Sequence, residues 1–191
     1  DVLLKRFKDF ISPFVDCWAY CLLKNHCHFI IKIKHVQEIE TIVLERPIEE
    51  RTVSQKQFLL DKERNTAIDV MLERQVNSFL VSYTNYIKNK YNRSGGLFQK
   101  PFKRVNIQGD GYLQQAIVYV NANAEKHMIV KDFATYPYSS YAAIIKNENS
   151  LVKQEEVLVF FESKDNFIKV HQEQVNYYYK TKWPASKIEV Q

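Results

Sequence analysis

The first apolar positions of the chain lie one helical turn apart, at Leu3, Leu4, Phe7, Phe10 and Ile11. That spacing gathers them on one side of a helix, with charged residues between them. Pro13 follows where such a helix has to end, because proline lacks the amide hydrogen that a helix interior uses. We expect a short amphipathic helix over residues 1–11.

Two runs rich in aromatic and β-branched residues come next, over 15–23 and 26–34. Only Lys24 and Asn25 separate them. A two-residue connection between such runs is typical of a tight antiparallel hairpin. We expect the hairpin to hold the residues that bear most on function.

Polarity rises over residues 35–65, where charges of both signs and Pro47 interrupt any apolar period. This stretch is expected to be a long connection with room for a short helix. Over 66–90 a helical period returns, at Ile68, Leu72, Val76, Phe79, Leu80, Tyr83 and Ile87. The sequence NRSGG then ends the pattern, so a long amphipathic helix is expected there.

The second half of the chain is expected to form one strand followed by helices. Residues 97–107 read as extended, and Asp110 can cap a helix that runs through Gln114, Ile117, Val120 and Ala124. TYPYSSY at 135–141 is turn-like. Two short helices are expected over 151–161 and 166–172, and the tail over 177–191 has no clear period.

The order of these elements indicates the fold class. Helix, hairpin, helix, strand and helix in succession suit an antiparallel sheet with helices packed against it, which is an α+β fold. A chain of 191 residues, 46% hydrophobic and 26% charged, is typical of one globular domain with a small addition. We therefore expect a domain over 1–145, including the connection at 35–65, and a C-terminal helical extension and tail over 146–191.

Charge points to a class of partner. Lysine and arginine number 27 against 22 aspartate and glutamate, giving +5 and a pI near 9.0, which favours a polyanionic partner. The excess is concentrated in KNKYNRSGGLFQKPFKR, whose six basic residues are Lys88, Lys90, Arg93, Lys100, Lys103 and Arg104. The aromatic residues Tyr91, Phe98 and Phe102 interleave with them, as suits contact with phosphates and bases of DNA. A solvated helix end and loop is the alternative.

The composition favours a cytoplasmic protein with no membrane association. No apolar run is long enough to span a bilayer, and DVLLKRFKDF alternates charge with hydrophobe, unlike a signal peptide. Cys17, Cys21 and Cys27 are odd in number and too few for a disulfide framework. Reduced thiols are expected.

A histidine pair marks the second strand of the hairpin. Side chains alternate along a strand, so His26 and His28 share one face while Cys27 lies on the other. Two neutral imidazoles at that spacing can bind one divalent ion, if another element adds an oxygen ligand. By itself, however, such a pair is more often two partly exposed histidines than a metal site.

The helix after Asp110 can supply the missing chemistry. Tyr119 and Asn123 are four residues apart and so lie one turn apart on one face. The Asn123 amide oxygen can complete a metal shell, and a tyrosine can be a covalent nucleophile when a metal polarises the phosphate under attack. The competing interpretation is a core aromatic, and Tyr112, two turns earlier, is the nearest rival nucleophile.

Four segments, in this order along the chain, match a known pattern: CLLKNHCHFIIKI, SGGLFQKPFKR, YLQQAIVYVNANAEKHMIV and TYPYSSY. Together they resemble the HUH single-tyrosine transposases, in particular those associated with repetitive extragenic palindromes. The matching features are a strand with two histidines, a basic strand, a tyrosine helix and the turn beyond it. LVKQEEVLVFFESKDNFIKVHQ is similar to the C-terminal helical pair of the bacterial members, so the resemblance covers most of the chain, from about Leu3 to His171.

The resemblance implies a function and a site. It implies a ferredoxin-like or RRM-like sheet and a transposase that cleaves and rejoins single-stranded DNA with hairpin ends. Tyr119 would be the nucleophile of a 5′-phosphotyrosine intermediate, and His26, His28 and Asn123 would bind Mg²⁺ or Mn²⁺. The protein would act in the bacterial cytoplasm, associated with the nucleoid when bound to DNA. A homodimer is left open, because relatives of both oligomeric states exist.

The sequence departs from the family at several positions. Lys24 and Ala124 stand where prolines are usual, His127 and Met128 occupy a turn of small residues, and a strand expected before the opening helix is not encoded. None of these removes a ligand or the nucleophile. The alternatives are a DNA-binding protein of the same fold that has lost cleavage, and an interaction domain whose histidines and tyrosine are structural. The last predicts a neutral face around the histidine pair.

Overall fold

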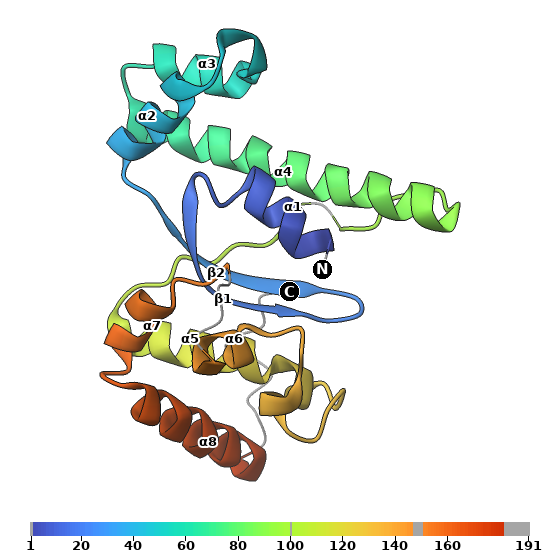
Figure 1. The fold of residues 1–191 in the computed structure, drawn as a ribbon, viewed down its shortest axis with the longest axis vertical. Coiled ribbons are helices and arrows are strands. Elements are labelled where there is room, and N and C mark those ends of the chain that lie inside the picture. The colour runs from blue at the N-terminus through green and yellow to red at the C-terminus, as the bar shows by residue number, and fades with distance from the viewer. Residues whose placement is uncertain (1, 100, 147–150, 182–191) are drawn as a thin grey trace. The chain divides into compact units, whose positions relative to one another are not determined.

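The chain divides into two compact units (Figure 1). The computed structural model describes residues 2–99, 101–146 and 151–181. Unit 1 comprises Asp1–Asp16 and Ile33–Phe102, and unit 2 comprises Cys17–Lys32 and Lys103–Gln191. The hairpin therefore contributes to both units, and the domain boundary expected after residue 145 falls inside unit 2.

Unit 1 is built on α1 (Val2–Phe10) and the long helix α4 (Arg64–Tyr91). The apolar face predicted for the opening helix packs on α4, where the rings of Phe7 and Phe79 meet edge to face at 5.8 Å. The Gln75 side-chain amide, buried on α4, donates to the Phe10 carbonyl at 2.8 Å. Both helices are confirmed, with boundaries close to those expected.

The stretch over 35–65, expected to be a long connection with room for a short helix, holds more helix than that. The segment folds as α2 (Val36–Glu45), a 3₁₀ turn η1 (Ile48–Glu50) and α3 (Val53–Leu60). Both helices contact α4 and bury one or two apolar residues each, including Ile39, Val43 and Phe58. Because so few positions are buried, the apolar period is too sparse to recognise in a polar sequence.

The end of α4 follows the predicted signal. Asn92 adopts a left-handed conformation (φ 46°), and its amide donates to the Lys88 carbonyl, which closes the helix. The predicted strand over 97–107 is absent from the described residues, which are at least partly exposed throughout and include Pro101. A strand needs a neighbouring strand to bond its amides, and no strand pairs with the described residues of this stretch. No helix in the described ranges combines the length and apolar character needed to cross a bilayer.

The sheet consists of the predicted hairpin, with β1 (Val15–Leu22) paired to β2 (Cys27–Ile33) in antiparallel fashion. The turn is closed by the Leu23 amide, which donates to the His26 carbonyl at 2.8 Å. With helices around it, this sheet makes the fold α+β, as predicted. It has two strands in the part of the chain that the structure describes.

Single bridges, not a further strand, cover the second edge of β1 within unit 2. Cys17 pairs with Val152 in parallel, and Cys21 pairs with Ser139 in antiparallel fashion. The Leu22 amide also donates to the Tyr138 carbonyl at 2.9 Å. Segments from the C-terminal half thus satisfy the backbone groups that would otherwise be an exposed strand edge.

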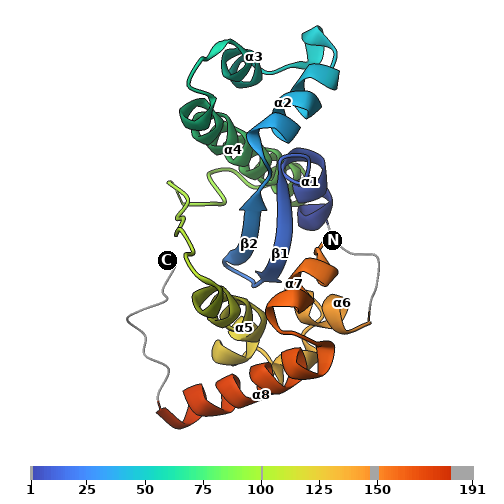
Figure 2. The ribbon, with the colours of Figure 1, turned by 90° about the vertical axis from the view of Figure 1, so that its left-hand side faces the viewer.

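Unit 2 surrounds its part of the hairpin with helices: α5 (Asp110–Lys126), η2 (Phe133–Thr135), α6 (Ser140–Lys146), α7 (Gln154–Phe160) and α8 (Lys164–Thr181). α8 contacts α5 along the unit (Figure 2). The two predicted C-terminal helices are confirmed, although α8 is longer than expected. Gly109 (φ 81°) takes the N-cap position expected for Asp110, which becomes the first helical residue.

Candidate active site

The hairpin turn places the two histidines side by side within unit 2. His26 immediately precedes β2 and His28 is its second residue, with ring centroids 5.0 Å apart. The Asn25 side-chain oxygen lies 2.8 Å from His26 Nδ1. An amide oxygen can only accept, so Nδ1 carries the hydrogen, and Nε2 of the neutral ring keeps its lone pair. The second nitrogen of His26 is thereby oriented as a ligand.

His28 is held in its neutral form. Burial, followed by the charges of His26, His127 and Lys126, lowers the pKa of His28 from 6.5 to about 4. Its Nε2 atom is buried and makes no hydrogen bond to any described residue. A metal ligand has to be a neutral imidazole with a free nitrogen, and His28 meets both conditions.

Helix α5 brings Tyr119 to the histidine pair and carries Asn123 one turn further along. Its sequence leaves almost no polar face here, because every residue from Ala116 to Ala124 is buried. The Tyr119 ring lies 5.9 Å from the His28 ring in an edge contact. Sequence reasoning expected these residues near one another, and the structure brings the histidine pair and the tyrosine together.

Two asparagines of α5 differ sharply in their surroundings. Asn121 is fully used by the fold: its oxygen accepts from the Ser140 hydroxyl at 2.6 Å, and its nitrogen lies 3.1 Å from His171 Nε2. Asn123 is also 0% exposed, yet neither its oxygen nor its nitrogen has a hydrogen-bond partner among the described residues. A buried amide left unbonded destabilises the fold by about 1–3 kcal/mol. Such a group calls for a functional explanation.

Lys126 is a part of this site that sequence reasoning missed. Its ammonium nitrogen donates to the Tyr119 hydroxyl at 3.3 Å and lies 4.7 Å from the centroid of the same ring. The signal was present in the sequence, because residues seven apart lie two turns apart on one helix face. The Tyr119 side chain is 4% exposed, and Lys126 is one of the groups that cover it.

His127 adds a third imidazole at the end of α5. Its ring centroid lies 4.9 Å from that of His26. Burial, then the charges of His127 and Lys126, lower the pKa of His26. His127, in the turn after α5, is therefore a neighbour of the histidine pair.

The candidate donors for a divalent ion are two imidazoles, of His26 and His28, and one amide, of Asn123. No group of three or more histidine, cysteine, aspartate or glutamate side chains in the described part of the chain is arranged to hold a metal. The unbonded atoms of His28 and Asn123 are the observation that favours a ligand here. Burial raises the pKa of Cys17 and Cys21 to about 12 and that of Cys27 to about 11, so all three remain thiols.

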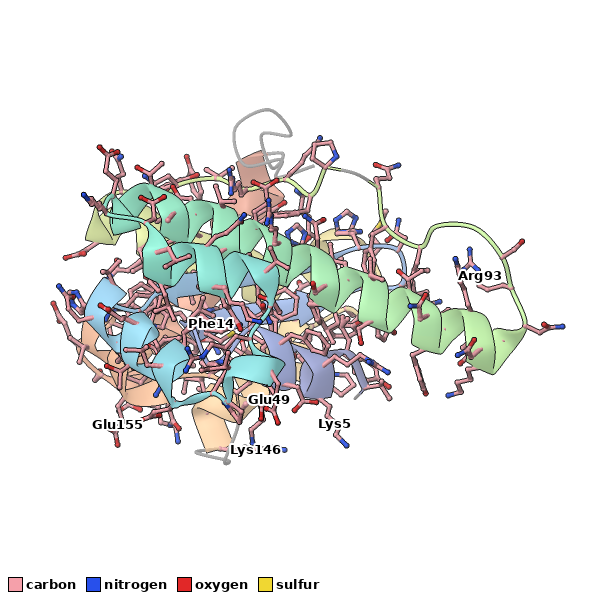
Figure 3. All side chains as sticks on the ribbon, turned by 90° about the horizontal axis from the view of Figure 1, so that it is seen from above. Lys5, Phe14, Glu49, Arg93, Lys146 and Glu155 are labelled. Atoms are coloured by element: carbon pink, nitrogen blue, oxygen red, sulfur yellow. The ribbon has the colours of Figure 1, made fainter. Side chains whose placement is uncertain are left out.

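The basic segment is split between the two units. Lys88, Lys90 and Arg93 belong to unit 1, where Arg93 projects from the loop after α4 (Figure 3). Lys103 and Arg104 belong to unit 2 and are exposed, while Lys100 lies outside the described residues. Of the interleaved aromatic residues, Tyr91 is 61% exposed and lies under the Lys90 ammonium at 5.3 Å.

Comparisons with known proteins add no relative to this picture. No protein-family model, no curated protein and no solved structure matches the chain.

Proposed function

We propose that this protein cleaves and rejoins single-stranded DNA through Tyr119, as a transposase of the HUH single-tyrosine type, with Mg²⁺ or Mn²⁺ bound by His26, His28 and Asn123. The observation that carries the proposal is Asn123, a fully buried amide with no bonding partner among the described residues. It lies one turn from a tyrosine whose ring contacts His28. The proposal includes a ferredoxin-like sheet, of which the two described strands would be a part.

In the cleavage step, the Tyr119 hydroxyl oxygen forms a bond to the phosphorus of a phosphodiester. The bond from phosphorus to the 3′ oxygen of the preceding nucleotide breaks. That oxygen takes up the proton lost by the phenol, by way of solvent, and leaves as a 3′ hydroxyl. The 5′-phosphotyrosine keeps the energy of the phosphodiester, so the reverse attack by a 3′ hydroxyl reseals the strand. The metal, when bound, polarises the phosphate under attack.

The protein's own residues orient this reaction. Lys126 donates to the hydroxyl oxygen, which directs the phenol, and its positive charge stabilises the negative charge that develops when the proton leaves. Tyr119 is 4% exposed, and the Lys126 ammonium over its ring is one of the groups that must move before DNA reaches the hydroxyl. A flexible lysine can make that movement without a change in the backbone.

The position of Lys126 also bears on the alternatives. A structural role for the histidines and the tyrosine predicts a neutral face around them, whereas the ammonium of Lys126 lies there. The alternative that keeps support is a DNA-binding protein without cleavage activity. The observation that favours it is the burial of Tyr119.

The test is a covalent adduct. The purified protein is incubated with Mn²⁺ and labelled single-stranded DNA that carries hairpin ends, and a denaturing gel is examined for protein joined to DNA. We expect an adduct that requires metal and is lost in Tyr119→Phe and in His28→Ala. Tyr112→Phe, which alters another tyrosine of α5, is the matched control and should retain the adduct. Binding without an adduct in any metal would establish the non-catalytic alternative.

A further inference from the structure

A polar cleft within unit 1 is lined by residues that are distinct from the histidines, Tyr119 and Asn123. It is formed by Arg6 of α1 and by one face of α4, and has a volume of about 500 Å³. The residues from α4 recur at helical spacing, which places them on one face: Ser82, Asn85, Tyr86, Asn89 and Lys90. Two of the six lining residues are cations and none is acidic.

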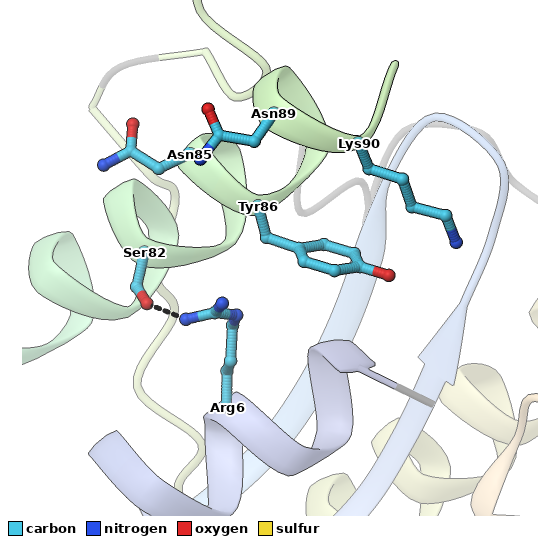
Figure 4. A pocket seen from close by; sticks show the side chains of 6 residues that line it. All are labelled: Arg6, Ser82, Asn85, Tyr86, Asn89 and Lys90. Carbon is cyan, nitrogen blue, oxygen red and sulfur yellow. Dashed lines mark hydrogen bonds between the residues drawn. The ribbon is translucent and has the colours of Figure 1, made fainter. Parts of the chain in front are cut away.

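The two cations flank a single aromatic ring. Arg6 and Lys90 each lie 5.6 Å from the centroid of Tyr86, which extends between them (Figure 4). Their charged groups are therefore no more than about 11 Å apart. Arg6 is fixed by a hydrogen bond to the Ser82 hydroxyl, and its Nε atom is buried without a partner among the described residues. Two cations on either side of one ring suit successive phosphates of one strand.

The amides of the cleft offer a second kind of recognition. Asn85 and Asn89 are exposed and lie one turn apart on α4 (Figure 4). Each presents a donor and an acceptor side by side, which matches the edge of an unpaired base. Tyr91, 61% exposed and in contact with Lys90, provides an aromatic face next to the cleft on which a base can stack.

We propose that this cleft binds single-stranded DNA, with successive phosphates at Arg6 and Lys90, on either side of Tyr86, and a base against Asn85 and Asn89. The inference rests on the proposed function for the class of nucleic acid. It adds a binding site in unit 1, with four lining residues that lie outside the basic segment: Arg6, Ser82, Asn85 and Tyr86. Paired bases present no free edge to the two amides, so a duplex should bind there more weakly.

The experiment measures binding of a fluorescein-labelled DNA of about 20 nucleotides, longer than the roughly 4–16 that a small domain covers. The full chain is used without metal, so cleavage does not interfere. Asn89→Asp places a negative charge in the cleft, and Lys90→Gln removes a positive one; both positions are exposed and need no repacking. We expect the Kd to rise about fivefold to tenfold in each.

Lys56→Gln is the matched control, because it removes an exposed lysine from α3 of the same unit and should leave the Kd unchanged. Values within twofold of the unaltered protein for both cleft variants would overturn the proposal. Arg6→Lys should weaken binding less than Arg6→Gln, and circular dichroism identifies any loss of folding in either.

Competition identifies the ligand. Thymidine monophosphate should displace the labelled DNA more effectively than inorganic phosphate at equal concentration. This advantage over phosphate should be smaller with Asn89→Asp than with the unaltered protein. Equal competition by the two would reduce the cleft to an anion site and overturn the assignment of a base. The adduct assay separates the two proposals. If the unaltered protein forms an adduct and the cleft variants bind DNA normally, only the proposed cleft is wrong. If the cleft variants bind more weakly and the unaltered protein forms no adduct, only the proposed cleavage is wrong.

Discussion

At the scale of single residues, α5 carries two buried asparagines that differ in their hydrogen bonding. Asn121 links α5 to Ser140 and His171, whereas Asn123, two positions along, bonds to no described residue. The position of Asn123 one turn from Tyr119 is visible in the sequence. The sequence could not reveal that the amide is buried and unbonded, because that depends on elements far away in the chain.

Replacement of Asn123 by leucine should therefore stabilise the metal-free protein and destroy its activity. Leucine has a similar shape and removes an unsatisfied polar group, so we expect the free energy of unfolding to rise by about 1 kcal/mol. Urea titration in the presence of a chelator measures it. Asn121→Leu is the matched control, and should lower the free energy of unfolding by about 1–3 kcal/mol because it breaks two buried bonds. A loss of stability in both variants alike would contradict a free Asn123.

His171 makes the stability of the protein sensitive to acid. The imidazole is 0% exposed and lies among Phe133, Tyr141, Phe161 and Phe167. Its Nδ1 donates to the Phe167 carbonyl at 2.8 Å, so Nε2 is the acceptor for Asn121. Protonation would remove that acceptor. Burial lowers the pKa of His171 from 6.5 to about 4.

The lowered pKa of His171 makes acid destabilise the folded protein. Between pH 6.5 and 4 the unfolded chain binds the proton and the folded chain does not, so stability falls as the pH drops through this window. The loss from His171 is at most about 3 kcal/mol. Urea unfolding of the unaltered protein and of His171→Gln should give a smaller slope against pH in the variant. Parallel slopes would mean that other groups carry the acid sensitivity.

At the scale of elements, short helices with little apolar surface depend on their ends. α3 begins with a capping box, in which the Thr52 hydroxyl accepts from the Gln55 amide at 3.2 Å and the Gln55 side chain accepts from the Thr52 amide at 3.1 Å. These two bonds satisfy backbone donors that a helix start leaves open. The Thr-x-x-Gln pattern is present in the sequence, but no clear apolar period follows it to mark the start of a helix.

Thr52→Ala should therefore lower the free energy of unfolding by about 1 kcal/mol, measured by urea titration. Thr41→Ala provides the comparison, since the Thr41 hydroxyl is exposed and only donates back to the Gln37 carbonyl within α2. We expect that change to stay within about 0.5 kcal/mol. Equal effects at the two threonines would show that the cap does not stabilise α3.

At the scale of the whole molecule, the net charge of +5 is a property that binding measurements can test. Each phosphate contact releases counterions, so affinity for DNA falls with salt. The double variant Lys88→Gln with Arg93→Gln should flatten the plot of log affinity against log salt by about two units, one for each contact. Removing two exposed lysines elsewhere in unit 1, Lys56 and Lys62, should leave the slope unchanged. If both double variants flattened the slope equally, the salt dependence would follow total charge, and a defined DNA surface at Lys88 and Arg93 would be contradicted.

The sequence by itself determined the elements whose signals are local. The hairpin, the opening helix, α4 and α5 follow from periodicity and turn chemistry, because each signal lies within the element that it describes. The same logic put His26 and His28 on one face and Tyr119 and Asn123 one turn apart. Local patterns did not reveal α2 and α3, because a few buried positions are enough to hold each helix. They also wrongly predicted a strand at 97–107, because a strand depends on a partner elsewhere in the chain.

Tertiary structure alone decided how the candidate site is assembled. It brought the α5 tyrosine against His28 of the hairpin, placed Lys126 on the Tyr119 hydroxyl, and left the Asn123 amide without a described partner. It also joined Arg6 of α1 to a face of α4 in one cleft. The physical reason is that burial, charge and hydrogen bonding at a site depend on atoms from distant segments, whose meeting no local pattern encodes.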